Sequence, residues 1–162
     1  MAMQKQVTLT VNGRLQEIGL PAHRTLLEVL RDLGYVEVKC GCEKGDCGAC
    51  AVLVDGEAVN ACVTLAWQAD GTAVTTVRGL AKPGEEHPLH TAFIQTGAVQ
   101  CGYCIPGMIV AAKALLDEHP DPTDEEIRRG LSGNLCRCTG YVQIFAAVRS
   151  AAAALRGEGG TP

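Results

Sequence analysis

Residues 42–50 read CEKGDCGAC, and a fourth cysteine, Cys62, follows after eleven further residues. The spacing C-x4-C-x2-C…C offers the thiols of Cys42, Cys47, Cys50 and Cys62, and it suits a [2Fe–2S] cluster. Three of these thiols come from one loop, so the loop has to curl around a bulky anionic core. Glycines within the loop permit that curvature and let backbone N–H groups approach the sulfurs. The less specific alternatives are a zinc site and a set of free buried thiols.

The number of cysteines in the chain needs an explanation. The chain has nine cysteines in 162 residues, which form two sets of four and leave Cys40 over. A secreted disulfide framework would favour an even number and an apolar leader segment, and the sequence shows neither. Metal binding is the better interpretation of both sets. Cys40 is interpreted as a small buried or bystander thiol rather than as a ligand.

The composition narrows the classes of partner. The chain is 47% hydrophobic and 20% charged, which is ordinary for a globular protein. A net charge of −4, no basic run and only 4% aromatic residues argue against nucleic-acid binding. No apolar run approaches the roughly 18 residues of a membrane span, and no leader segment is recognisable. We therefore expect a cytoplasmic protein without a membrane span.

The first half carries strand patterns and one helix. Asn12-Gly13 and Asp55-Gly56 are hairpin turn signals, and each is flanked by apolar strand residues. A capping box from Thr25 to Glu28 opens a helix that runs to about Leu33. Strands are expected at residues 5–11, 14–20, 51–54, 57–60 and 74–77. This pattern predicts a small open sheet packed on one helix.

The second half is predicted to be helical. Gly79, Pro83 and Gly84 mark a linker near residue 78, after which the strand patterns stop. Thr123 and Thr139 are expected to cap the last two helices. Helices are predicted at residues 87–99, 105–119, 123–131 and 139–155, and a disordered tail at 157–162. We therefore predict an α+β chain with domains at 1–78 and 79–162, the second a four-helix bundle.

A second set of cysteines lies in two helix connections. Cys101 and Cys104 join the first two predicted helices, and Cys136 and Cys138 join the last two. Both pairs lie near helix N-termini, where free N–H groups and the helix dipole favour thiolates and anionic clusters. Brought together, the pairs would offer four thiolates to one centre. The spacing alone suits zinc as well as an iron–sulfur cluster.

Three segments, GCEKGDCGACAVLVDG, QCGYCIPGM and LSGNLCRCTGY, occur in this order. Together they resemble the small iron–sulfur subunit of the molybdenum hydroxylases, the family of xanthine dehydrogenase, aldehyde oxidoreductase and carbon monoxide dehydrogenase. The resemblance covers roughly residues 5–150. It implies a ferredoxin-like β-grasp domain and a four-helix domain, with one [2Fe–2S] cluster in each. The first cluster would take Cys42, Cys47, Cys50 and Cys62, and the second would take Cys101, Cys104, Cys136 and Cys138.

The resemblance also implies a place in a larger enzyme. The second cluster would lie next to a molybdopterin held by a large subunit, and the first would face an FAD subunit or another acceptor. Gln100 matches a glutamine that contacts the pterin, and the loop around Cys138 matches the one that approaches the pterin amino group. Position 40 usually holds a residue other than cysteine. The implied assembly is often a dimer of heterotrimers.

The leading hypothesis is therefore an electron-transfer subunit without catalytic residues of its own. A non-redox scaffold with two structural zinc sites is the first rival, and it would be colourless where a [2Fe–2S] protein is red-brown. A free-standing ferredoxin shuttle is the second rival, and the helical half counts against it. The histidines show no metal spacing and are interpreted as surface residues: His23, His87, His90 and His119.

Overall fold

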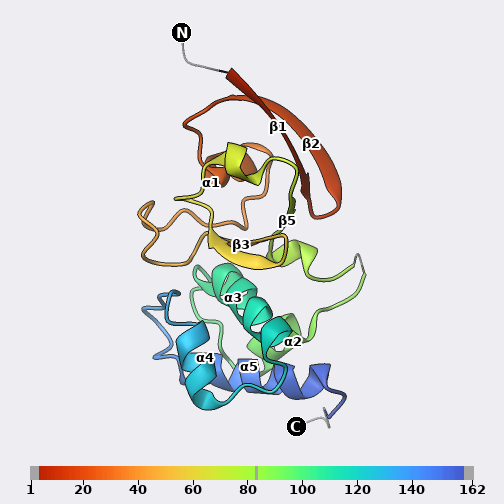
Figure 1. The fold of residues 1–162 in the computed structure, drawn as a ribbon. Helices are drawn as coiled ribbons and strands as arrows, with labels where there is room; N and C mark the ends of the chain where they lie inside the picture. Colours follow the sequence, from red (N-terminus) through yellow and green to blue (C-terminus); the bar gives the residue numbers. More distant parts are fainter. Residues whose placement is uncertain (1–3, 83, 159–162) are drawn as a thin grey trace.

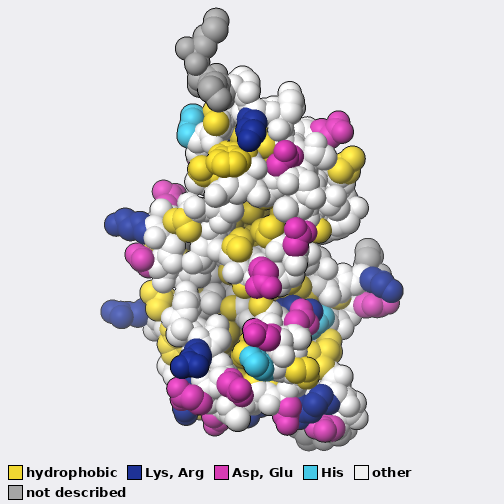
Figure 2. All heavy atoms as spheres, viewed as in Figure 1, with side chains coloured by type: hydrophobic (Ala, Val, Ile, Leu, Met, Phe, Trp, Pro, Cys, Tyr) yellow, Lys and Arg dark blue, Asp and Glu magenta, His cyan; other side chains and the backbone are white. Residues whose placement is uncertain are grey.

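A computed structural model describes residues 4–82 and 84–158 (Figure 1). Most of the predicted disordered tail lies outside these residues, and so does Pro83 of the predicted linker. The strand-rich half and the helical half lie one against the other, with β3 and α3 facing each other where they meet (Figure 1). Charged side chains of both signs are interspersed over the face shown in Figure 2.

The first half contains one mixed five-stranded sheet in the order β2-β1-β5-β3-β4. Strands β1 and β5 run parallel, and the other neighbours run antiparallel. Asn12 and Asp55 have φ angles of 50° and 49°, and the glycines after them also have positive φ, as tight hairpins require. Both predicted turns are therefore confirmed. The strands span Gln4–Val11 (β1), Arg14–Pro21 (β2), Ala51–Val54 (β3), Glu57–Asn60 (β4) and Ala73–Thr75 (β5).

One helix, α1 (Leu26–Asp32), packs on this sheet. The capping box is confirmed, because the Thr25 hydroxyl accepts from the Glu28 N–H and the Glu28 carboxylate accepts from the Thr25 N–H. The predicted end is also confirmed, with Leu33 as C-cap and Gly34 at φ +90°. The apolar face of α1 meets the inward residues of β1 in a core that includes Val7, Leu9, Val11, Leu26 and Leu30.

The last strand is shorter than predicted. It ends at Thr75, and Val77–Gly79 forms a 3-10 turn where the sequence predicted a strand to residue 77. The cause is the environment of Thr76, whose N–H donates to Asn12 Oδ1 at 2.9 Å. Its hydroxyl donates to Glu37 Oε1 at 2.8 Å. These side-chain partners take the place of a neighbouring strand.

The second half is built from the helices α2 (Pro88–Gln95), α3 (Ile105–Glu118), α4 (Asp124–Gly130) and α5 (Val142–Leu155). The predictions for α3 and α4 are confirmed to within one or two residues, and Thr123 forms a capping box with Glu126. The helices share one apolar core, whose largest fully buried side chains are Phe93, Leu89, Met108, Ile127, Leu131 and Ile144. In the part of the chain that the structure describes, no helix is long and apolar enough to cross a membrane.

Two helix predictions need correction. Helix α2 ends at Gln95 rather than near residue 99, because Gly97 adopts φ +69° and turns the chain away. Ile94, near the end of that helix, is 73% exposed. Helix α5 begins after Tyr141, which occupies the N-cap position with φ 71°. Thr139 does not cap it, because its hydroxyl donates to Cys136 Sγ and accepts from the Tyr141 N–H.

Strand β3 joins the two halves through the alternation of its side chains. Val52 points into the core beneath α1, whereas Ala51 and Leu53 pack against Val110 of α3. A strand that buries both of its faces reads as a continuous apolar run, and AVLV is such a run. The helical half therefore covers a sheet face that would otherwise be open.

Candidate metal centres

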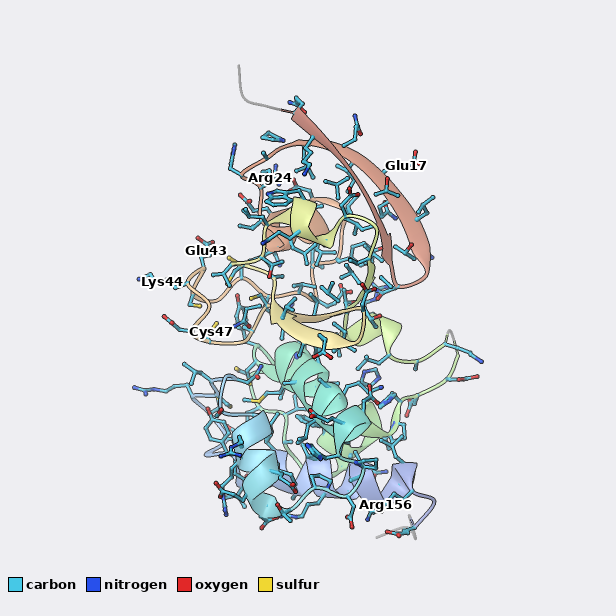
Figure 3. All side chains as sticks on the ribbon, viewed as in Figure 1. Glu17, Arg24, Glu43, Lys44, Cys47 and Arg156 are labelled. Atoms are coloured by element: carbon cyan, nitrogen blue, oxygen red, sulfur yellow. The ribbon has the colours of Figure 1, made fainter. Side chains whose placement is uncertain are left out.

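The loop between α1 and β3 brings four predicted ligands together as two pairs. The thiol of Cys42 lies close to that of Cys47, and the thiol of Cys50 lies close to that of Cys62. Cys42 and Cys47 are half-buried, whereas Cys50 and Cys62 are buried in the core of the strand-rich half. Figure 3 shows Glu43, Lys44 and Cys47 along one edge of the molecule, where this loop passes above the helical half.

The two pairs of the first site differ in their electrostatic surroundings. Hydrogen bonds from the backbone N–H groups of Lys44, Cys47 and Asp46 lower the pKa of Cys42 to about 6. The Lys44 N–H lies 3.4 Å from Cys42 Sγ. Burial raises the pKa of Cys50 to about 12. The loop thus supplies N–H donors to sulfur on its outer side, and donors of this kind also stabilise and tune an anionic cluster.

A close approach within this loop requires glycine. A Cβ atom at Gly41 would lie 2.7 Å from Cys47 Sγ, which is shorter than real contacts allow. Any side chain at position 41 would therefore push Cys47 away from its neighbours. The glycine that precedes Cys42 is needed for space, not for an unusual backbone angle.

The second site follows the same plan in the helical half. Cys101 and Cys138 form an exposed outer pair with their sulfurs 3.6 Å apart. Cys104 and Cys136 form a half-buried inner pair at the edge of the helical core. Burial raises the pKa of Cys104 to about 12. Burial also opposes ionisation of Cys136, but hydrogen bonds from the Thr139 hydroxyl and nearby backbone groups lower its pKa overall.

Tyr141 shapes the loop that carries Cys136 and Cys138. Its hydroxyl accepts a hydrogen bond from the Cys136 N–H at 2.8 Å and donates to the Asn134 carbonyl at 3.1 Å. The left-handed backbone at Tyr141 turns the side chain back over the loop that precedes it. The sequence analysis missed this role of Tyr141, because the motif alone carries no signal for it.

The paired arrangement bears on the kind of metal centre. Within residues 4–82 and 84–158, no three or more His, Cys, Asp or Glu side chains converge as a single ion would require. The predicted ligands form two pairs at each site instead. A [2Fe–2S] cluster takes four thiolates, two on each iron, so the donor set and its pairing fit such a cluster. The assignment of individual cysteines as ligands stays a prediction.

Two further predicted site residues lie at the outer edge of the second site. Gln100 is exposed and directly precedes Cys101, and Cys138 is exposed as well. Cys40 does not join the first set. Its thiol donates to Glu43 Oε1 at 2.8 Å, and it packs against the core of the strand-rich half.

Contacts between the two sites were not anticipated from the sequence. The Leu135 N–H donates to the Cys47 carbonyl at 2.9 Å, and Asn134 Nδ2 donates to the Gly48 carbonyl at 3.0 Å. The Tyr103 hydroxyl donates to the Cys40 carbonyl at 2.5 Å. The motifs contain these residues, but nothing in their spacing indicates that they meet across the two halves.

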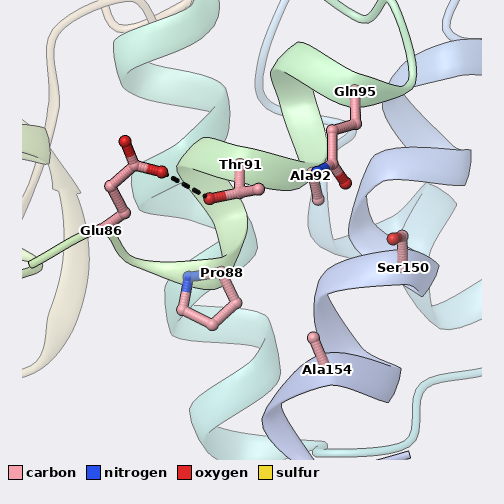
Figure 4. A pocket seen from close by; sticks show the side chains of 7 residues that line it. All are labelled: Glu86, Pro88, Thr91, Ala92, Gln95, Ser150 and Ala154. Carbon is pink, nitrogen blue, oxygen red and sulfur yellow. Dashed lines mark hydrogen bonds between the residues drawn. The ribbon is translucent and has the colours of Figure 1, made fainter. Parts of the chain in front are cut away.

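The concave regions of the surface lie away from the thiols. A groove of about 250 Å³ runs between α2 and α5 (Figure 4), where the Thr91 hydroxyl donates to Glu86 Oε2 at 3.0 Å. No cysteine lines it. Its lining consists of Glu86, Pro88, Thr91, Ala92, Gln95, Ser150 and Ala154. This groove therefore lies apart from the two thiol sites.

Comparison with protein families divides the chain into the same two halves that the structure shows. Residues 9–75 match a 2Fe-2S iron-sulfur cluster binding domain, and residues 76–149 match a [2Fe-2S] binding domain. The chain therefore contains two domains of the [2Fe–2S]-binding type. The zinc alternative for the second set rested on cysteine spacing alone. The match of residues 76–149 to a [2Fe-2S] binding domain favours an iron–sulfur cluster there instead.

Individual relatives match over nearly their whole length. The chain is 52% identical over 146 residues to the nicotinate dehydrogenase small FeS subunit of Eubacterium barkeri, covering 90% of this chain and 93% of that one. It is 46% identical over 147 residues to the nicotine 6-hydroxylase small subunit of Paenarthrobacter nicotinovorans, covering 90% and 88%.

Solved structures show the same fold. A chain of quinoline 2-oxidoreductase from Pseudomonas putida 86 superposes with a TM-score of 0.89 at 40% identity, covering 96% of this chain and 98% of that one. The aldehyde oxidoreductase of Desulfovibrio desulfuricans superposes with a TM-score of 0.91 at 47% identity. There the match covers 95% of this chain but only 17% of the other. The same unit therefore occurs as a separate chain and as part of a much longer one.

Proposed function

Because the chain belongs to the family of small iron–sulfur subunits of the molybdenum hydroxylases, we propose that it relays electrons between the molybdopterin centre of a large subunit and FAD or another acceptor. The relay uses two [2Fe–2S] clusters in series. When bound, each cluster supplies a one-electron redox centre, and the chain contributes ligands, burial and N–H donors. The first cluster is held by Cys42, Cys47, Cys50 and Cys62, and the second by Cys101, Cys104, Cys136 and Cys138.

One observation carries this proposal. The Leu135 N–H donates to the carbonyl of Cys47 at 2.9 Å, and Leu135 directly precedes Cys136. A proposed ligand of the first cluster is thus joined to a proposed ligand of the second by covalent bonds and a single hydrogen bond. Two independent structural metal sites would have no need of such contact. A relay needs its centres close together and fixed.

The surroundings of the second site support a docking face for the large subunit. Large apolar side chains are exposed beside the outer thiols Cys101 and Cys138, and exposed apolar groups in one region are typical of interaction sites. They are Val99, Tyr103, Leu135 and Val142. On this face Gln100 and the Cys138 loop contact the pterin. The first cluster faces the FAD subunit, and the complex is a dimer of heterotrimers.

The relatives also bear on which chain of the complex holds the substrate site. Chains 46–52% identical to this one are named for nicotinate, xanthine, nicotine and aldehyde enzymes. Small subunits this similar serve enzymes with different named substrates, so the substrate site lies in a partner chain. The longer aldehyde oxidoreductase, of which this chain matches 17%, carries the same unit within one polypeptide.

The finer architecture and the compartment belong to the same proposal. Residues 1–78 form a ferredoxin-like β-grasp domain, and residues 79–162 form a four-helix bundle. Free thiols as cluster ligands suit a reducing compartment, and the complex is therefore placed in the cytoplasm.

Metal analysis of the purified chain tests the proposal most directly. We expect about four irons and four acid-labile sulfides per chain. Dithionite reduction should give two distinct S = 1/2 EPR signals, and a larger molybdenum-containing chain should co-purify. Zinc in place of iron, or a single cluster, would refute the two-centre relay. Two clusters in a chain that never associates with larger subunits would support a shuttle ferredoxin instead.

A further inference from the structure

Asn134 is an unusual residue in this fold because it is polar and buried. In the described part of the chain, the buried polar residues are Thr76, His87 and Asn134, and Asn134 is 6% exposed. Burying an amide without a partner is costly. Asn134 Nδ2 finds its partner outside its own half of the molecule, in the carbonyl of Gly48 at 3.0 Å.

The contact around Gly48 is too close for any other residue at that position. A Cβ atom on Gly48 would lie 2.5 Å from Asn134 Nδ2 and 2.5 Å from the carbonyl oxygen of Gly133, and the φ angle of Gly48 is +67°. On its other side, a Cβ atom on Gly107 would lie 2.1 Å from the Gly48 carbonyl oxygen. The Gly48 carbonyl is therefore enclosed between Asn134 and the first turn of α3.

These residues belong to the loops that carry the proposed ligands. Gly48 follows Cys47 in the first site. Asn134 lies two residues before Cys136, and Gly107 lies three residues after Cys104, so both loops of the second site converge on Gly48. The one side-chain hydrogen bond in this contact comes from Asn134. An aspartate there would turn a carboxylate toward a carbonyl oxygen, and an apolar residue would leave that oxygen without this donor.

We propose that Asn134 is a positioning residue that fixes the separation and orientation of the two clusters and thereby sets the coupling between them. The inference rests on the proposed function, since it requires two clusters in this chain. It assigns part of the coupling to this buried amide, which adds a side-chain bond to the backbone bond from Leu135 to Cys47 between the same two loops. The ligands alone would fix each cluster only within its own half.

The test compares two asparagines that make the same bond to the same loop. Asn60 Nδ2 donates to the Gly45 carbonyl at 2.9 Å, from β4 within the strand-rich half. Asn134→Ala and Asn60→Ala each remove one amide donor, but only the first links the two halves. The measurement is low-temperature EPR of the cluster-loaded full chain after dithionite reduction, with iron content determined in parallel. Asn134→Ala should keep both signals and reduce the spin–spin splitting between them, because the backbone bond from Leu135 to Cys47 still joins the loops. Asn60→Ala should leave the splitting unchanged.

Each other outcome has a defined meaning. A wild-type chain without two signals overturns the relay and this inference together. Two interacting signals in the wild-type chain and an unchanged splitting in Asn134→Ala overturn only this inference. Reduced splitting in Asn60→Ala as well would do the same, because the effect would then not be specific to the contact between the halves.

A milder variant covers the case in which Asn134→Ala does not retain both clusters. Asn134→Ser keeps a small polar side chain that is too short to reach the Gly48 carbonyl, and it should lower the splitting while both signals persist. Loss of a cluster from both variants would overturn the inference, because Asn134 would then be needed for cluster binding and not for spacing.

Discussion

The two thiol sites share a plan but differ in their surroundings. Each has an inner pair toward an apolar core and an outer pair toward the surface. In the first site the inner cysteines, Cys50 and Cys62, are only 2% and 7% exposed, and the outer pair is half-buried. In the second site the inner pair is half-buried, and the outer pair, Cys101 and Cys138, is exposed. Each pair of the second site is thus more exposed than the corresponding pair of the first site.

This difference follows from how the chain builds each site. One continuous loop and the strand-rich core enclose the first site, so its ligands are surrounded by their own domain. The second site joins two loops at the ends of helices and is closed on one side only. In the proposed relay, this more exposed second site is the one that faces the large subunit. Solvent exposure is also one of the factors that set cluster potential, so we expect the two centres to differ in potential.

The largest effect should come from removing an exposed ligand. Cys138→Ala should lower the iron content from about four to about two per chain, with loss of one EPR signal. The first site should remain loaded, because its thiols lie in the other half. In the assembled complex, turnover with a distant acceptor should stop while the large subunit still binds substrate.

The ninth cysteine provides the matched control for that experiment. Cys40→Ala should keep both clusters, because the Cys40 thiol is bonded to Glu43 and lies outside the four-thiol set. Normal turnover by an assembled Cys138→Ala complex would refute the series relay. Loss of a cluster in Cys40→Ala would move the first ligand from Cys42 to Cys40.

A second prediction compares the glycines of the two sites. Gly41→Ala would place a Cβ atom 2.7 Å from Cys47 Sγ, whereas a Cβ atom at Gly133 would meet nothing within 4 Å. When Cys47 is held by a cluster, the clash should cost about 1–3 kcal/mol, the usual cost of overpacking. Gly41→Ala should therefore weaken the first EPR signal selectively, and Gly133→Ala should leave both signals intact. Equal tolerance at both positions would show that the first loop has more room than the structure indicates.

Much of this organisation could be predicted from the sequence, because it depends on local rules. The hairpins at Asn12-Gly13 and Asp55-Gly56 and the capping boxes at Thr25 and Thr123 are confirmed, since each involves residues within a few positions of one another. The two sets of four cysteines also followed from local spacing. The structure brings them together in pairs, and their roles as ligands stay predictions.

The end of β5 was mispredicted because distant residues decide it, whereas the start of α5 was missed although its partners lie near in the sequence. The end of β5 is set by the side chains of Asn12 and Glu37 on Thr76, and Glu37 lies far from Thr76 in sequence. The start of α5 is set by Tyr141, whose hydroxyl reaches back to the Cys136 loop. His87 was expected at the surface and is buried. A pattern of neighbouring residues cannot report partners that only folding brings together.

A smaller effect should come from the tyrosine that holds one loop only. Tyr141→Phe keeps the ring, which lies 5.9 Å from that of Phe145 between centroids, but removes the hydroxyl bonded to Cys136 N and Asn134 O. The helical half should lose about 1 kcal/mol of stability, the ordinary net value of a hydrogen bond. The second EPR signal should shift while the first does not. A shift in both signals would mean that the loops of the two sites move together.

The smallest predicted difference between the halves is in how the stability of their helix caps responds to acidic pH. Helix α1 is capped by Thr25 and Glu28, and the hydrogen bond from the Thr25 backbone lowers the pKa of Glu28. The stability that this hydrogen bond contributes is present above about pH 4.5. It is lost only as the pH falls through the lowered pKa of Glu28. Helix α2 is capped by His87, whose Nδ1 accepts from the Leu89 N–H at 3.2 Å. This bond requires an unprotonated nitrogen.

The effect of His87 on the pH dependence of stability is opposite in sign to that of a histidine paired with a carboxylate. Burial lowers the pKa of His87, assisted by the neighbouring His90 and by the positive charge of Lys113, while Asp117 acts in the other direction. Below about pH 6.5 the unfolded chain takes up a proton that the folded chain resists, so stability falls as the pH drops toward 5. The α2 cap should therefore fail at a higher pH than the α1 cap. Hydrogen exchange of the two helices at pH 7.5 and 5.5, corrected for the intrinsic pH dependence of exchange, measures the difference.

His87→Asn separates this titration from the cap itself. Asparagine is a good N-cap and does not titrate, so the variant should lose less stability between pH 7.5 and 5.5 than the wild-type chain, by under about 1 kcal/mol. An identical pH response in His87→Asn and the wild-type chain would show that acid does not distinguish the two halves through this cap.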